Sequence, residues 1–221
     1  MPATFDNSSS VSEAASVGPD WSHTNTAGNM LIMFIGGWDG TGRTVTATYA
    51  GTSMTEIADT TLSNGNDRVW GFRLANPATG ANTIATTISG GSMHIIAGAV
   101  SVAGAHTTDF STAVTDASLV NGTSASVLVT GTVNGLIVDG LASGNNDTHA
   151  VNGPASHTER WDLSLSAQGE AGTGGTSTGT ASEQTIGWTI SQSASWAMAA
   201  VNVKESAAAN PTRPQRPMPM I

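Results

Sequence analysis

The stretch that decides the fold is residues 29–38, which read NMLIMFIGGW. Its centre, Leu31–Ile35, is continuously apolar but far shorter than the roughly 18 residues that a membrane-spanning helix needs. A short apolar run without alternation is typical of a central β-strand that is covered on both faces. The stretch therefore predicts an inner strand of a layered β-structure, which ends where the sequence continues as DGTG after Trp38.

The segments around this strand have the alternation and the turn residues of further strands. Residues 44–49 read TVTATY, so that Val45, Ala47 and Tyr49 share one face and the threonines share the other. Residues 93–102 are rich in Gly and Ala, which allows a covering layer to approach closely. About eleven such segments suit two sheets packed face to face. We expect an all-β fold: a two-sheet antiparallel β-sandwich, jelly-roll-like, with extended N- and C-terminal arms.

Composition supports this fold and excludes several kinds of partner. Only 10% of the residues are charged, against about 25% in an average globular protein, and Lys204 is the only lysine. The net charge of −9 opposes binding to nucleic acid or to an anionic membrane, so we expect neither partner. The absence of cysteine excludes disulfides, a thiolate nucleophile and a cysteine zinc site.

The ends of the chain differ from its middle. Residues 1–19 predict an N-terminal arm or an edge strand, and residues 20–204 a single β-sandwich domain. Residues 205–221 hold four of the eight prolines and therefore predict an extended, Pro-rich C-terminal arm.

A weak internal repeat links the two halves of the domain. Residues 67–70 (DRVW) resemble 157–161 (HTERW), and 87–89 (TIS) resemble 189–191 (TIS), each TIS preceding an apolar strand. Two explanations stay open at this point: convergent strand composition, or a pseudo-symmetric sandwich in which each half gives a similar set of strands.

Motifs for catalysis or cofactor binding are weak. Residues 172–179 (GTGGTSTG) lack the Lys-Ser/Thr ending of a phosphate loop, and we expect a flexible loop there. Ser177 matches Gly-x-Ser-x-Gly by chance, without the strand and helix of a nucleophile elbow. The five histidines have no metal-binding spacing, and Asn/Asp turns explain residues 64–67 and 145–147 better than calcium ligation does. We expect no catalytic residue, no cofactor and no metal.

The six tryptophans are the more informative set. An exposed indole offers a flat amphipathic face on which a sugar ring can stack. Trp70, Trp161 and Trp196 lie in apolar alternation and are expected in the core. Trp21 and Trp38 lie near strand ends and are the candidate glycan contacts.

The order of these segments resembles a family of jelly-roll-like β-sandwich modules found in bacteriophage virion proteins and some bacterial surface proteins. The segments that carry the resemblance are 21–24 (WSHT), 31–38 (LIMFIGGW), 45–55 (VTATYAGTSMT), 69–80 (VWGFRLANPATG), 97–105 (AGAVSVAGA) and 196–204 (WAMAAVNVK). The resemblance implies a non-catalytic structural or adhesive module. Because the N-terminus has no secretory leader pattern and the module fills most of the chain, we expect a virion protein made in the host cytoplasm.

The first hypothesis is therefore a capsid decoration or cement protein, homo-oligomeric, that clasps capsid or other virion proteins with an arm. The partner-binding residues are expected in the C-terminal arm: Pro211, Arg213, Pro214, Arg216, Pro217, Met218, Met220 and Ile221. Alternatives are a tail or fibre component, and a carbohydrate-binding adhesive module that uses Trp21 or Trp38. A glycan hydrolase with an acidic pair is the least favoured alternative.

Overall fold

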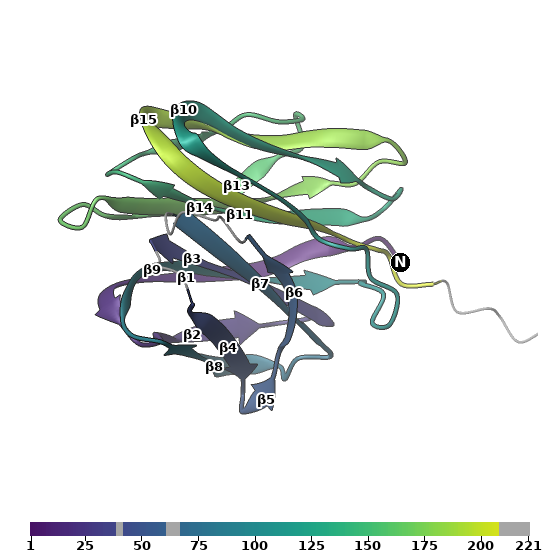
Figure 1. Ribbon diagram of the computed structural model, residues 1–221. Helices are drawn as coiled ribbons and strands as arrows, with labels where there is room; N and C mark the ends of the chain where they lie inside the picture. Colours follow the sequence, from purple (N-terminus) through teal and green to yellow (C-terminus); the bar gives the residue numbers. More distant parts are fainter. Residues whose placement is uncertain (39–41, 61–66, 208–221) are drawn as a thin grey trace, which may run out of the picture.

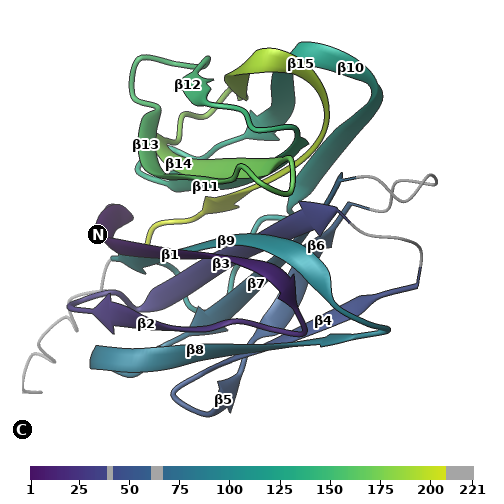
Figure 2. The same ribbon diagram turned by 90° about the vertical axis from the view of Figure 1, so that its left-hand side faces the viewer.

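The computed structural model of the protein describes residues 1–38, 42–60 and 67–207, with the backbone alone over 117–120. These residues form three antiparallel sheets stacked in layers (Figures 1 and 2). The all-β, sandwich-like fold predicted from the sequence is confirmed, and there are three sheets where two were expected.

The first half of the chain, here called unit 1 (residues 1–110), forms two of these sheets. Sheet 1 contains, in spatial order, β1 (Thr4–Ser16), β9 (Met93–Ala103), β3 (Met30–Trp38), β7 (Asp67–Ala75) and β6 (Thr55–Asp59). Sheet 2 contains β2 (Asp20–Asn25), β8 (Gly80–Ser89), β4 (Thr44–Tyr49) and β5 (Thr52–Ser53).

The second half, here called unit 2 (residues 111–207), forms sheet 3. Its spatial order is β10 (Val114–Thr130), β15 (Glu183–Val203), β11 (Leu136–Gly144), β14 (Glu170–Thr178) and β13 (Thr158–Leu165), with β12 (His149–Val151) paired to β15. The long strands β10 and β15 bend sharply, so that sheet 3 folds over on itself (Figures 1 and 2). Unit 2 is therefore also a sandwich, made from one continuous sheet.

The two units have the same strand connectivity. In unit 1 the layer β1-β9-β3-β7-β6 faces the layer β2-β8-β4. In unit 2 one layer runs from the first part of β10 through the last part of β15 to β11, β14 and β13. The facing layer consists of the second part of β10, the first part of β15 and β12. Of the two explanations for the internal repeat, this topology supports the pseudo-symmetric one. The TIS segments occupy equivalent places, before β9 and before the last part of β15; DRVW and HTERW do not, because they begin β7 and β13.

The chain passes from one layer to the other between β1 and β2 and between β8 and β9 in unit 1. Glycines explain why the strands are interrupted there, whereas the equivalent strands of unit 2 are continuous. Unit 1 turns its corners at Gly18, Gly90 and Gly91, whose φ angles of +139°, +90° and +122° interrupt a strand. The equivalent corner in unit 2 falls between the pairs Ser124–Thr189 and Gly122–Ala194, where the register shifts but the strands continue.

Three hydrophobic cores hold the layers together. Between sheet 1 and sheet 2 lie Leu31, Met33 and Ile35 of β3, with side chains from β4 and β8. The alternate residues Met30 and Ile32, with Phe34, pack against β11 and β15 of unit 2. A third core fills the inside of unit 2. Both faces of β3 are buried, as its unbroken apolar run predicts.

The N-terminal segment forms an edge strand rather than a free arm. β1 pairs antiparallel with β9 from Thr4–Ala103 to Ser16–Met93, with two register shifts. Of the two alternatives for residues 1–19, the edge strand is the one that the structure has.

Small residues let the two units approach closely. A Cβ atom on Gly98 of β9 in unit 1 would collide with the indole ring of Trp161 on β13 in unit 2. A Cβ on Gly140 would lie 2.5 Å from the Cβ of Phe34. The close approach predicted for residues 93–102 is thus confirmed.

We expect Gly98→Ala to destabilise the protein by about 1–3 kcal/mol, because the added methyl group overpacks the seam between the units. Urea denaturation followed by tryptophan fluorescence measures this change. Trp161→Phe shrinks the ring that the added methyl group meets. It should therefore lower the free energy of unfolding less in the Gly98→Ala variant than in the wild type. Additive effects of the two substitutions would contradict the proposed contact.

Candidate functional site

The structure separates the two tryptophans that the sequence offered as glycan contacts. Trp21 is only 9% exposed and lies in the core between sheets 1 and 2, where its Nε1–H donates a 3.0 Å hydrogen bond to Ser9 Oγ. The prediction that Trp21 reaches the surface is therefore wrong. The reason is the alternation of β2, whose inward positions are Trp21, His23 and Asn25.

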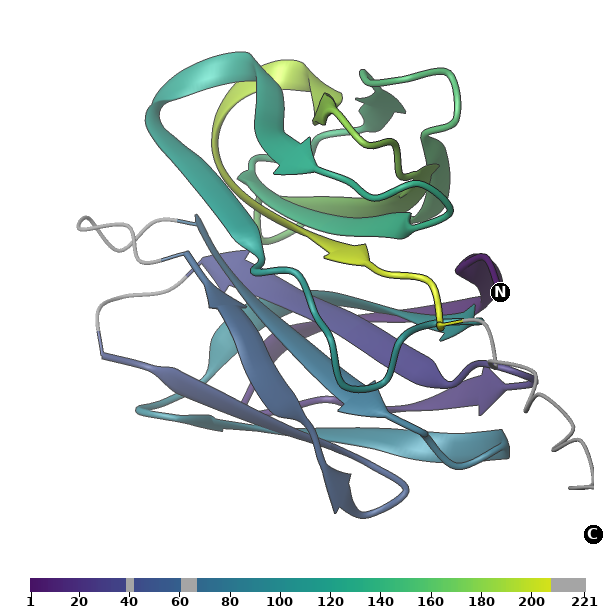
Figure 3. The same cartoon turned by 90° about the vertical axis from the view of Figure 1, so that its right-hand side faces the viewer.

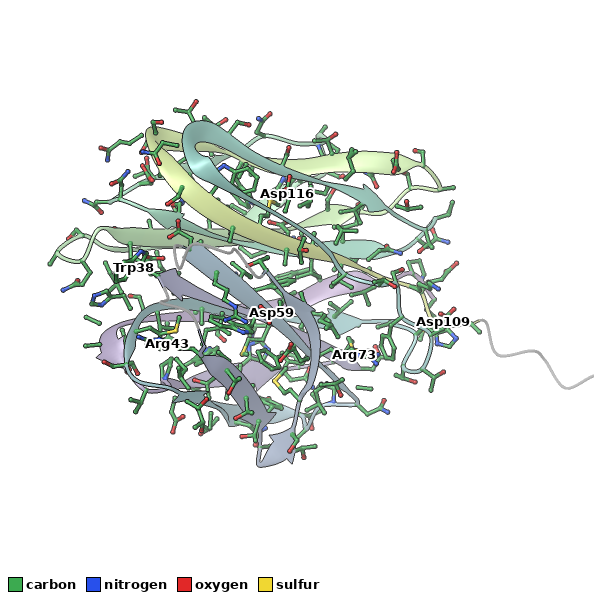
Figure 4. All side chains as sticks on the ribbon, in the orientation of Figure 1. Trp38, Arg43, Asp59, Arg73, Asp109 and Asp116 are labelled. Carbon is green, nitrogen blue, oxygen red and sulfur yellow. The ribbon has the colours of Figure 1, made fainter. Side chains whose placement is uncertain are left out.

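Trp38 is exposed, as expected. It is the last residue of β3, and 53% of its surface is accessible, whereas the preceding residues of the strand are buried. Trp70, Trp161 and Trp196 are buried at 1%, 7% and 7%, which confirms their placement in the core. Trp38 lies at the level where the two units meet (Figure 4). Its role in binding a glycan stays a prediction.

A pocket of about 370 Å³ opens beside Trp38, at the junction of the units. Unit 1 contributes two lining residues and unit 2 six: Trp38 and His94, and Gly144, Asn145, Gln168, Gly169, Glu170 and Ser195. In unit 2, the segment after β11 and the segment before β14 are joined, because the N–H of Asn145 donates a 2.6 Å hydrogen bond to the carbonyl of Gly169. Gly169 has a φ of +66°, a conformation that suits a residue without a side chain.

Two buried carboxyl groups connect the units at this place. Asp67 of unit 1 is 0% exposed and accepts a 2.6 Å hydrogen bond from Ser195 Oγ of unit 2. Glu170 of unit 2 is 1% exposed and accepts a hydrogen bond from the backbone N–H of Trp38 in unit 1. The other oxygen, Glu170 Oε1, has no hydrogen-bond partner among the described residues.

Burial changes the protonation of both groups. It raises the pKa of Asp67 to about 6, although the hydrogen bond from Ser195 opposes the change. It also raises the pKa of Glu170 well above its ordinary value, and the nearby charge of Asp67 adds to this effect. Burial therefore favours the uncharged form of both carboxyl groups, of which Glu170 lines the pocket.

We expect Asp67→Asn to remove a pH-dependent cost in stability. The folded protein keeps a proton on Asp67 up to about pH 6, whereas the unfolded chain releases it near its ordinary pKa of 3.8, so stability from this group falls as the pH rises between these values. Relative to the wild type, Asp67→Asn should gain about 1 kcal/mol between pH 5 and pH 7.

Chemical denaturation of both proteins at the two pH values measures this difference. The comparison with the wild type is needed because burial lowers the pKa of His23 to about 4, which acts with the opposite sign over the same range. The exposed Asp20→Asn serves as the control. A difference that does not vary with pH would contradict the burial of an ionisable Asp67.

Unit 2 contains a Ser–His–Asp arrangement that the sequence did not indicate. Ser143 Oγ lies 3.0 Å from His149 Nε2, and His149 Nδ1 lies 2.8 Å from Asp162 Oδ1. These groups have the order of an acyl-transfer triad. However, Ser143 is 0% exposed, so a substrate carbonyl has no access to its hydroxyl. In this structure the arrangement gives the buried hydroxyl of Ser143 and the ring nitrogens of His149 their hydrogen-bond partners.

A second buried pair stabilises the same unit. His157 Nε2 lies 2.9 Å from Asp139 Oδ2, and Trp188 Nε1–H donates a 2.7 Å hydrogen bond to Asp139 Oδ1. All three side chains are buried. They fix the position of β11 against β13 and β15.

The glycine-rich segment is not a loop, contrary to expectation. Residues 172–178 belong to β14, a central strand of sheet 3. Its glycines are needed there because a Cβ on Gly172 would lie 2.6 Å from the carbonyl of Leu141 and 2.9 Å from Ile96. Ser177 is 1% exposed and contacts Ser156 Oγ at 2.8 Å, so it is no exposed nucleophile.

Sequence reasoning found only Trp38 among the residues that line the pocket. Asp67 and Glu170 are far apart in the chain, and neither belongs to a catalytic motif. The sequence signal that could have indicated them is their position: in a chain with few charges, Asp67 begins an apolar strand and Glu170 begins a glycine-rich one. The predicted partner-binding residues, from Pro211 to Ile221, lie outside the described residues.

Two further kinds of site have no support in the part of the chain that the structure describes. Within the described ranges, no three His, Asp or Glu side chains are grouped to hold a metal ion. The same part of the chain contains no helix with the length and apolarity to cross a membrane. No family model matches the chain, and neither a curated protein sequence nor a solved structure resembles it significantly.

Proposed function

We propose that the protein is a non-enzymatic structural protein of a bacteriophage virion, a capsid decoration or cement protein that clasps its neighbours through the segment after Ala207. The sequence resemblance to virion sandwich modules supports this role. The observation that carries it is that the first residue and the last described residues of the chain are fixed at one end of the body.

The start of the chain is joined to the last part that the structure describes. The amino group of Met1 donates to the carbonyl of Ser206 at 2.9 Å, and the N–H of Ser206 donates to the carbonyl of Gly104 at 2.7 Å. Glu205 forms a β-bridge with Ala105. Figure 3 shows the N-terminus beside the end of β15. The Pro-rich segment 208–221 therefore starts from a fixed point on the body.

A fixed starting point favours attachment to a neighbour. An extended Pro-rich segment loses little conformational entropy on binding, and anchoring it at a defined place increases its effective concentration near an adjacent subunit. On a closed lattice, many such weak contacts add up to stable assembly. The same argument applies to a tail or fibre location and to a homo-oligomer, which are variants of this proposal.

We expect deletion of residues 208–221 to leave a folded protein with unchanged thermal stability that no longer joins virion shells. The deletion should begin after Ala207, because Glu205 and Ser206 contact the body, and removing them would weaken the fold as well. Light scattering and co-sedimentation with shells of the same virion measure the bound copy number.

The matched control replaces residues 208–221 with a Gly/Ser segment of equal length. It keeps the length but not the prolines, arginines and terminal apolar residues, and it should also fail to bind. If either variant joined shells at the copy number of the wild type, the clasp would be refuted.

A further inference from the structure

We propose that the pocket beside Trp38 is a binding site for an uncharged saccharide, in which the indole of Trp38 is the stacking platform. This inference goes beyond the proposed role in assembly and does not depend on it.

The first argument is the unusual exposure of Trp38. It is 53% exposed, whereas the other five tryptophans are at most 9% exposed. An indole exposed beside a pocket offers apolar surface that a ligand can cover, and covering it is favourable. The apolar C–H face of a sugar ring suits this surface, because it covers the indole while the hydroxyl groups of the sugar stay free for hydrogen bonds.

The second argument is the polar lining of the pocket. Asn145, Gln168 and Ser195 line it and carry amide and hydroxyl groups, which are the usual partners of sugar hydroxyls. Asn145 is held in place because its Nδ2 donates a 3.1 Å hydrogen bond to the carbonyl of Ser193. The rim is therefore formed before a ligand binds.

The third argument is an unsatisfied buried atom. Glu170 is 1% exposed and lines the pocket, and its Oε1 has no hydrogen-bond partner among the described residues. A buried oxygen without a partner is costly. Burial raises the pKa of this carboxyl group, which favours its uncharged form, so Glu170 contributes no ionic contact that would select a charged ligand.

The charge of the site selects for an uncharged ligand. Among the described residues that line the pocket there is no arginine or lysine that would pair with a carboxylate or sulfate on a sugar. The molecule also carries a net charge of −9, which repels anions. The pocket volume of about 370 Å³ lies within the range of small-ligand sites, about 300–1,000 Å³, and accommodates one or two sugar rings.

The place of the pocket suits a surface role. Trp38 lies at the opposite side of the molecule from Asp109, which is close to the point where the chain leaves the described structure (Figure 4). A protein held at the terminal end would therefore present the pocket away from its attachment.

The test uses the free, full-length protein on an array of neutral and sialylated glycans, followed by calorimetric titration of the neutral oligosaccharide that binds best. We expect binding to neutral glycans, weakened about tenfold or more by Trp38→Ala, since the stacking contact is lost. Gln168→Ala, which changes an exposed side chain in the polar lining, should also weaken binding.

The matched control is Leu128→Ala, because Leu128 is an exposed apolar residue, 59% accessible, that does not line the pocket. It should leave binding unchanged, and circular dichroism should show all variants folded. The inference is overturned if no neutral glycan binds, if acidic glycans bind better, or if Trp38→Ala binds as the wild type does. None of these outcomes affects shell binding, so the two proposals fail separately.

Discussion

Sheet 1 carries apolar side chains on both of its faces, and this constraint determines how the rest of the molecule is arranged. One face of β3 presents Leu31, Met33 and Ile35 to sheet 2, and the other presents Met30 and Phe34 to unit 2. Neither face can be left in water without a large loss of hydrophobic free energy. The two units are therefore packed back to back, and small residues such as Gly98 and Gly140 are needed where they meet.

Much of this arrangement is predictable from local sequence, because strand patterns report which faces are buried. The unbroken apolar run of residues 30–35 correctly indicates a strand covered on both sides, and the alternation of residues 44–49 correctly indicates one covered face. The glycine-rich β14 shows the limit of such patterns. Its composition is that of a loop, and its strand conformation depends on neighbours that approach it, Leu141 and Ile96, which lie elsewhere in the chain.

The pocket could not be predicted in the same way, because it is made by contact between two similar units. Trp38 and His94 come from one unit and Gln168, Glu170 and Ser195 from the other. A single indole near a strand end is visible in the sequence, but Trp21 has the same appearance and is buried. Only the packing of the units distinguishes the two. Trp38 is exposed because it ends β3 at the junction of the units, where the described residues leave 53% of its surface accessible.

The units are fastened to each other by different chemistry at the two sides of the molecule. At the terminal side, the amino group of Met1 in unit 1 donates to the carbonyl of Ser206 in unit 2, and the N–H of Ser206 donates to the carbonyl of Gly104 in unit 1. At the pocket side, the link from Asp67 to Ser195 and the link from Trp38 to Glu170 involve buried carboxyl groups. Ionisation of these groups works against their burial. At the pocket side, protonation of Asp67 and Glu170 therefore favours the folded state, because burial raises the pKa of both groups.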